Sequence, residues 1–315
     1  MSSSMPTRRG PARWAAVLVL LGVLAAPAVA WAQPPGVVAE NTVDGRARLV
    51  VSGAGPIAVT VDGQPQPITT TPLVSDGSAM TLVVDTSADG GAGLAPGLGG
   101  LVDFALAAPP TTRTALVTDT TPPAVVAALQ SGPAGVLTGL SGITPRGERQ
   151  TVAALDLAVA QLPPEPDSPR LVVLYTSGAG TAVAADDLAA RLRADGVVLA
   201  VVTTADDGYW GAVAAGTGGV AVAARPTGVV DAFGQVATAL RTRSLVTLPA
   251  PERSPTAAVV RVGAQPVDTV LPSAAQRVSP VVVGAGVVLG VVVLMLAVAA
   301  LAGLWRRLRQ VRHAH

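Results

Sequence analysis

Residues Ala79–Gly91 read "AMTLVVDTSADGG", an apolar run that ends in polar side chains. The segment Met80–Val84 has the length and composition of a strand buried on both faces of a sheet. Asp85, Ser87 and Asp89 follow at alternate positions, and carboxylate and hydroxyl oxygens are the ligands that hard cations such as Mg²⁺ prefer. We take these three residues as candidate metal ligands. The alternative is that Asp85 and Ser87 only bond backbone N–H groups of their own loop.

Further along the chain, strand-like and helix-like patterns alternate. Thr114–Thr118 and Ala124–Leu129 surround a Thr-Thr-Pro-Pro turn and are expected to form an antiparallel pair. Other strands are expected at Leu171–Tyr175, Val197–Val202 and Gly219–Ala223, and helices at Leu98–Ala108, Val152–Leu162, Asp186–Asp195, Tyr209–Ala215 and Val229–Leu240. Strands separated by helices predict an α/β fold, a doubly wound and mostly parallel sheet with helices on both faces.

Short strand patterns also lie on either side of this region. Ala47–Val51 and Ile57–Val61 alternate toward Asp62-Gly63 and are expected to form a hairpin-like pair. Leu245–Leu248 and Ala257–Val262 are expected to be further strands. We predict that the two flanks pair into one small β module, with the α/β domain inserted in it. The segments Pro249–Pro255 and Ala264–Arg277 are typical of a disordered stalk.

The two ends of the sequence carry targeting features. Three arginines precede the apolar run Trp14–Ala26, and Ala30-Trp31-Ala32 offers a signal-peptidase site, so residues 1–32 are expected to be a signal peptide. Val281–Leu304 contains no charged residue and is long enough to span a bilayer. Four arginines follow it and predict a cytoplasmic tail at 305–315. The chain is expected in the cell membrane, single-pass, with its N-terminal domain extracytoplasmic.

Charge and composition exclude several functions for the exported part. All 21 basic residues are arginine and seven lie in the two end segments, which leaves 14 against 20 acidic residues. A net charge of −6 argues against nucleic acid as a partner. Cysteine is absent, and histidine occurs only as His313 and His315. Thiol catalysis, disulfides, zinc fingers and the Ser-His-Asp triad are excluded there, so we expect no enzyme.

Four segments in order carry a family resemblance. They are "LVVDTSADGG" (82–91), "GERQTVAALDLAVAQL" (147–162), "RLVVLYTSGAG" (170–180) and "AAGTGGVAVAARPTGVVDAFGQVATAL" (214–240). This arrangement resembles the von Willebrand factor type A (vWA) domain over about residues 76–243. The resemblance implies a site of the form Asp-x-Ser-x-Ser, completed by a threonine and an aspartate from later loops, that binds Mg²⁺ or a similar cation. It also implies an open position for a partner's carboxylate.

The match to that site is partial. Asp85 and Ser87 agree with the pattern, but Asp89 stands where the second serine belongs, and Ser177 replaces the aspartate of Thr-Asp-Gly. Neither Thr144 nor Thr151 is in register for the threonine. We therefore interpret Asp85, Ser87, Asp89 and Ser177 as a degenerate site that needs no cofactor. A weak site for Mg²⁺ or another divalent cation is the open alternative.

These observations predict a membrane-tethered, extracytoplasmic vWA-like module for protein–protein interaction or adhesion, with other envelope or membrane proteins as partners and no enzymatic activity. Its layout resembles bacterial components associated with pilus or secretion machinery. The alternatives are an exported enzyme or a nucleotide-binding α/β protein, because "RLVVLYTSGAG" begins like a dinucleotide-binding unit. The expected organisation is a signal peptide (1–32), a β flank (33–75), the vWA-like domain (76–243), a second β flank (244–263), a stalk (264–280), a transmembrane helix (281–304) and a cytoplasmic tail (305–315).

Overall fold

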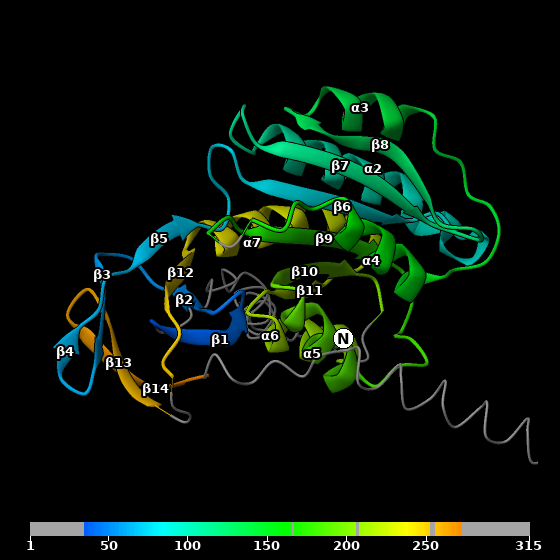
Figure 1. The fold of residues 1–315 in the computed structure, drawn as a ribbon. Helices are drawn as coiled ribbons and strands as arrows, with labels where there is room; N and C mark the ends of the chain where they lie inside the picture. The colour runs from blue at the N-terminus through cyan, green and yellow to red at the C-terminus, as the bar shows by residue number, and fades with distance from the viewer. Residues whose placement is uncertain (1–34, 166, 206–207, 253–255, 273–315) are drawn as a thin grey trace, which may run out of the picture. The chain divides into compact units, whose positions relative to one another are not determined.

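The computed structural model of the protein describes residues 35–272, apart from 166, 206–207 and 253–255. Figure 1 shows one large sheet covered by helices, together with two smaller sheets. The predicted signal peptide and transmembrane helix lie outside the described residues. Within the described part, none of the helices combines the length and apolar character needed to cross a membrane.

The large sheet has six strands in the order β11-β10-β9-β6-β7-β8. All of them run parallel except β8, which pairs antiparallel with β7 as the Pro-containing turn predicted. The strands are β6 (Ala79–Asp85), β7 (Arg113–Asp119), β8 (Ala124–Ser131), β9 (Arg170–Thr176), β10 (Val197–Thr203) and β11 (Ala221–Ala223). Strand order reverses between β6 and β9, so the sheet is doubly wound, and ligand sites in such sheets lie where the carboxyl ends of these two strands meet.

Helices cover both faces of this sheet. One face is packed by α2 (Gly91–Leu106), α3 (Ala134–Ser141) and α7 (Val229–Arg241), and the other by α4 (Thr151–Ala160), α5 (Ala185–Ala194) and α6 (Tyr209–Gly216). The predicted α/β class is confirmed. Helix α3 was not predicted; it buries only Val136 and Leu140, too few apolar positions to show a helical period. In α4 the buried side is Ala154, Leu155 and Ala158, with Val159 only half-buried.

Helix α2 approaches the sheet closely because it is rich in glycine. A Cβ atom at Gly97 would lie 2.2 Å from Cε1 of Tyr175 on β9, so only glycine fits there. The Tyr175 hydroxyl donates to the carbonyl of Gly93, 2.5 Å away. Burial, and then the negative charge of Asp85, raise the pKa of Tyr175 to about 12. The close packing at Gly97 and the hydrogen bond to Gly93 hold α2 against β9, the strand next to β6.

The two flanks of the sequence form two further sheets, which together we call the β module. One has the order β1-β2-β12-β5 and the other β14-β13-β3-β4. The strands are β1 (Gly36–Val43), β2 (Arg46–Ser52), β3 (Ile57–Val61), β4 (Gln64–Pro65), β5 (Thr69–Pro72), β12 (Arg243–Pro249), β13 (Thr256–Val262) and β14 (Gln265–Leu271). The N-terminal β2 pairs with the C-terminal β12, and β3 pairs with β13. The predicted pairing of the flanks is therefore found, with the α/β domain between them.

Two details of the flanks differ from expectation. Strands β2 and β3 do not form a hairpin with each other, because the chain leaves one sheet for the other at Gly53 and Gly55, whose φ values are +129° and +112°. The start of the predicted stalk, at Gln265–Leu271, is instead strand β14, paired antiparallel with β13. Exposed Gln265, Pro266 and Asp268 concealed the strand that ends at the buried Leu271.

Candidate functional site

The candidate site lies at the carboxyl ends of β6, β7 and β9. Strand β6 ends at Asp85 and its neighbour β7 ends at Asp119, and these two aspartates are register partners in the sheet. Ser177 follows β9 on the other side of β6. The parallel strands thus carry two carboxylates and a hydroxyl to the switch point of the sheet, because their carboxyl ends share one edge.

The Asp85 carboxylate is fully buried and accepts hydrogen bonds on both oxygens. Oδ1 accepts from the backbone N–H of Ser87, at 3.0 Å, and from its hydroxyl, at 2.6 Å. Oδ2 accepts from the backbone N–H of Ser177, at 2.9 Å, and from its hydroxyl, at 2.7 Å. The structure therefore brings together three of the four predicted site residues.

The fourth predicted residue does not join the site. Asp89 lies on the 3-10 turn η1 (Ala88–Gly90), where its side chain is exposed. Within the described residues it makes no hydrogen bond or ion pair with the site. A carboxylate at this position cannot replace the one lost at Ser177, because η1 holds it in the solvent.

A residue that the sequence reasoning missed, Arg149, completes the site. Its Nε donates to Asp85 Oδ2 at 2.8 Å, and its Nη2 donates to the hydroxyls of Ser177, at 2.8 Å, and Ser87, at 3.2 Å. The Arg149 side chain remains 23% exposed. It lies in the loop before α4, 64 residues from Asp85 along the chain, and no sequence motif marks it.

Electrostatics differ sharply between the two aspartates. Burial alone would raise the pKa of Asp85, but hydrogen bonds from Ser87 and Ser177 and the charge of Arg149 outweigh it and lower that pKa. Burial raises the pKa of Asp119, and hydrogen bonds from Thr151 and Gln150 offset only part of the effect. The ionised form is therefore favoured at Asp85 and disfavoured at Asp119.

The Asp119 carboxylate is hydrogen-bonded to the N-terminal end of helix α4. Its Oδ1 accepts the backbone N–H of Gln150 at 2.6 Å, and its Oδ2 accepts the hydroxyl of Thr151 at 2.5 Å. A carboxylate at a helix N-terminus satisfies an unpaired N–H group and interacts favourably with the helix dipole. Of the two threonines considered from sequence, Thr151 is thus bound to Asp119, whereas Thr144 is exposed in the preceding loop.

These residues, as placed, do not fit a divalent cation. The two hydroxyls and the carboxylate that would ligate the ion all face Arg149 nitrogens. A divalent cation of this type binds six or more oxygen ligands. At this position it would be repelled by the positive charge of the guanidinium. Within the described residues there is also no cluster of three or more acidic or histidine side chains able to hold a metal.

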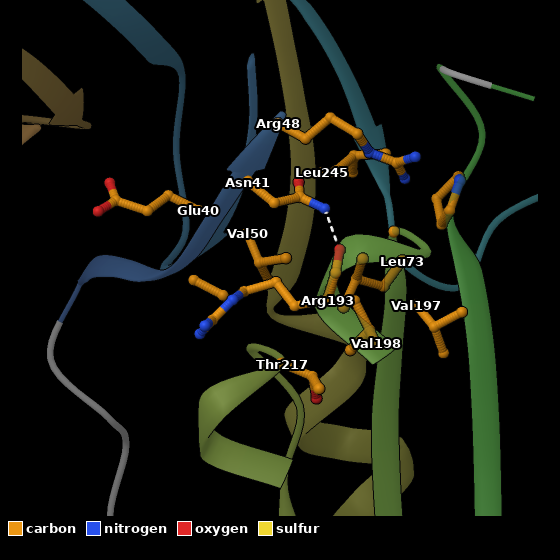
Figure 2. Close-up of a pocket in the computed structure, with 13 residues that line it drawn as sticks. Glu40, Asn41, Arg48, Val50, Leu73, Arg193, Val197, Val198, Thr217 and Leu245 are labelled. Carbon is orange, nitrogen blue, oxygen red and sulfur yellow. Dashed lines mark hydrogen bonds between the residues drawn. The ribbon is translucent and has the colours of Figure 1, made fainter. Parts of the chain in front are cut away.

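Two other regions were candidates for a binding site. The glycine-containing loop after β9 is closed by α6, since Tyr209 donates to the carbonyl of Val183 at 2.8 Å and Trp210 to that of Gly178 at 2.8 Å. Figure 2 shows a small pocket beside β1 and α5, where the Asn41 side chain donates to the carbonyl of Arg193. Its lining is mostly aliphatic, and it offers no acid and base pair in contact.

Comparison with solved structures gives matches to vWA proteins at low identity. A vWA protein from Catenulispora acidiphila is 10% identical, with a TM-score of 0.45, over 75% of this chain and 70% of that one. An aerotolerance-related membrane protein from Bacteroides fragilis is 13% identical, with a TM-score of 0.46, over 52% and 98%.

The proximal thread matrix protein 1 of the mussel byssus, with a zinc-occupied metal-ion-dependent adhesion site, is 17% identical, with a TM-score of 0.47. The match covers 58% of this chain and about half (49%) of the mussel protein. No protein-family model matches the sequence, and no curated protein does. The strand order and the helices on both faces agree with the doubly wound α/β fold that the sequence resemblance predicts for this part of the chain.

Proposed function

We propose that this chain is a membrane-tethered, extracytoplasmic interaction module whose vWA-like domain binds another envelope protein. The proposed contact surface is the rim of the candidate site, formed by the exposed residues Ala88, Asp89 and 144–148 around the partly exposed Arg149. The observation that carries the proposal is the convergence of Asp85, Ser177 and Arg149 at the switch point, where a doubly wound sheet offers a ligand site.

Binding is favoured over catalysis by the chemistry of the residues present. Histidine and cysteine are absent from residues 1–312, and the Asp85 carboxylate is occupied by hydrogen bonds on both oxygens. A general base needs a free lone pair within reach of a substrate proton. The Asp119 carboxylate likewise accepts a hydrogen bond from the backbone N–H of Gln150 at the start of α4. The proposal therefore assigns the site no catalytic role.

The partner is proposed to be an envelope protein because the sequence predicts export and a C-terminal membrane anchor. The layout, with β strands before and after the domain, resembles components of pilus or secretion machinery. Partners of that kind would meet the module close to the outer surface of the cytoplasmic membrane. The exposed edge of Arg149 suits an acidic side chain on such a partner.

Site-specific photo-crosslinking in intact cells tests this proposal. A photoreactive residue at Glu148, exposed on the proposed rim, should give a discrete cross-linked product that mass spectrometry identifies as an envelope protein. The matched control is Gln235, which is exposed on α7, a helix that contributes no residue to the proposed rim. Cross-linking that is absent at Glu148, or equal at both positions, would contradict the proposed surface.

A further inference from the structure

Arg149 occupies the centre of the three side chains that the vWA pattern assigns to a cation. One guanidinium contacts the Asp85 carboxylate, the Ser87 hydroxyl and the Ser177 hydroxyl, at 2.8, 3.2 and 2.8 Å. Both hydroxyls donate their own protons to Asp85, so their lone pairs are left to accept from Arg149. Each of the three groups is thus oriented as it would be toward a positive ion.

The loop that carries Arg149 is anchored on both sides, so this placement is built into the fold. Before Arg149, the backbone N–H of Arg146 donates to the carbonyl of Thr86 at 2.8 Å, and the carbonyl of Gly147 accepts from Ala88 at 3.0 Å. After it, Gln150 donates to Asp119. Gly147 has φ +67°, a conformation that favours glycine and turns the chain toward the site.

Close packing also favours this position of the guanidinium. A Cβ atom on Gly178 would lie 2.8 Å from Arg149 Nη1, so the glycine after Ser177 leaves the room that the arginine uses. Nε and Nη2 both donate to side chains of the site, so this edge of the guanidinium holds the three side chains together.

We propose that Arg149 is a built-in cation, whose guanidinium replaces the divalent ion of the vWA site so that the site works without metal. One positive charge on Arg149 balances the one carboxylate on Asp85, which a divalent ion would overcompensate. The loss of the family's second carboxylate, at Ser177, matches this lower charge. The assignment rests on the same site as the proposed function, but its test needs no partner, so each can fail without the other.

The test compares Mn²⁺ binding in three versions of the full-length chain in mild detergent. They are the native chain, Ser177→Asp, and Ser177→Asp combined with Arg149→Ala. Binding is measured by electron paramagnetic resonance of free Mn²⁺ and by the melting temperature with Mn²⁺ or chelator. We expect the double variant to bind at least tenfold more tightly than Ser177→Asp, because only there are two carboxylates present without the guanidinium.

Arg146→Ala in the Ser177→Asp background is the matched control, since Arg146 is exposed three residues earlier in the same loop. It should leave Mn²⁺ affinity unchanged. Equal affinity in Ser177→Asp and the double variant would overturn the proposal. The native chain provides a second test that does not depend on an Arg149 variant. If the native chain binds Mn²⁺ and Asp85→Ala abolishes that binding, the proposal is overturned too.

Discussion

The candidate site and the β module are built from opposite kinds of side chain. In the site, a buried carboxylate is held by hydroxyls, backbone N–H groups and one arginine. In the β module, two sheets pack face to face through aliphatic side chains such as Leu49, Val246 and Val260, all fully buried. The site joins the loops after β6 and β9 to the loop before α4, whereas the module joins the segments that precede and follow the inserted domain.

The two regions should therefore respond differently to substitution. An aliphatic interface tolerates substitutions of similar volume, because dispersion and burial are non-directional. The site has no such tolerance, since each polar group depends on a partner at a fixed distance. Substitutions in the site should therefore act through unpaired polar groups and charges, and those in the module through cavities.

The largest expected effect is that of Asp85→Ala. The substitution removes the acceptor for Ser87, Ser177 and Arg149 together, and breaking a buried ion pair on one side costs about 3 to 5 kcal/mol. Denaturant unfolding of the purified chain measures the loss. A cost below about 1 kcal/mol would mean that polar contacts do not hold the site.

Leu49→Ala should come next, with a cost of about 3 kcal/mol for the cavity left between the two sheets of the β module. The same unfolding experiment measures it. Val270→Ala is the control, since Val270 on β14 is 48% exposed and its truncation should change the unfolding free energy little. Equal effects of the two substitutions would show that the sheets do not share a packed core.

The pH dependence of stability should differ between the two aspartates. Because the pKa of Asp85 is lowered in the folded state, its stabilising contribution is present above its unfolded pKa and is lost as the pH falls through the folded pKa. The pKa of Asp119 is raised, so its contribution is present below the unfolded pKa and is lost as the pH rises through the folded pKa.

Asp85→Asn and Asp119→Asn test these signs by unfolding across the acidic range. Relative to Asp119→Asn, the native chain should gain stability as the pH falls through the raised pKa. Relative to Asp85→Asn, it should lose stability at still lower pH. Parallel stability curves for all three proteins would refute the opposite shifts.

The smallest effect is expected for Asp89→Ala. Asp89 is exposed on η1 and contacts no group of the site. Its replacement should change the unfolding free energy by no more than about 0.5 kcal/mol. A loss of unfolding free energy comparable to that of Asp85→Ala would show that Asp89 does contribute to the site.

Much of the fold could be predicted because buried strands and amphipathic helices leave periodic patterns. Strand β6, entirely buried, is a continuous apolar run, and β8 follows a Pro-containing turn. Strand β14 was assigned to a stalk because Pro266 and the exposed polar residues Gln265 and Asp268 mask the pattern. Strands β2 and β3 read as one hairpin, since alternation alone does not tell to which sheet a strand belongs.

The site was predictable only as far as its local motif. Asp85 and Ser87 lie two residues apart, and Ser177 follows a recognisable strand. Arg149 lies in a loop without periodicity, and its contact with Asp85 depends on the turn at Gly147 and on the backbone bonds of this loop to Thr86 and Ala88. Asp119 ends a strand that carries no motif, so nothing distinguished it from an ordinary loop aspartate.

A double-mutant cycle on Asp85 and Arg149 tests most directly whether the arginine is the charge partner at the centre of the site. Unfolding free energies are measured for the native chain, Asp85→Ala, Arg149→Ala and the double variant. If the guanidinium neutralises the carboxylate, the double variant should be destabilised by well under the sum of the two single effects, with a coupling of at least about 1 kcal/mol. Additive effects of the two substitutions, within about 0.5 kcal/mol, would contradict the account.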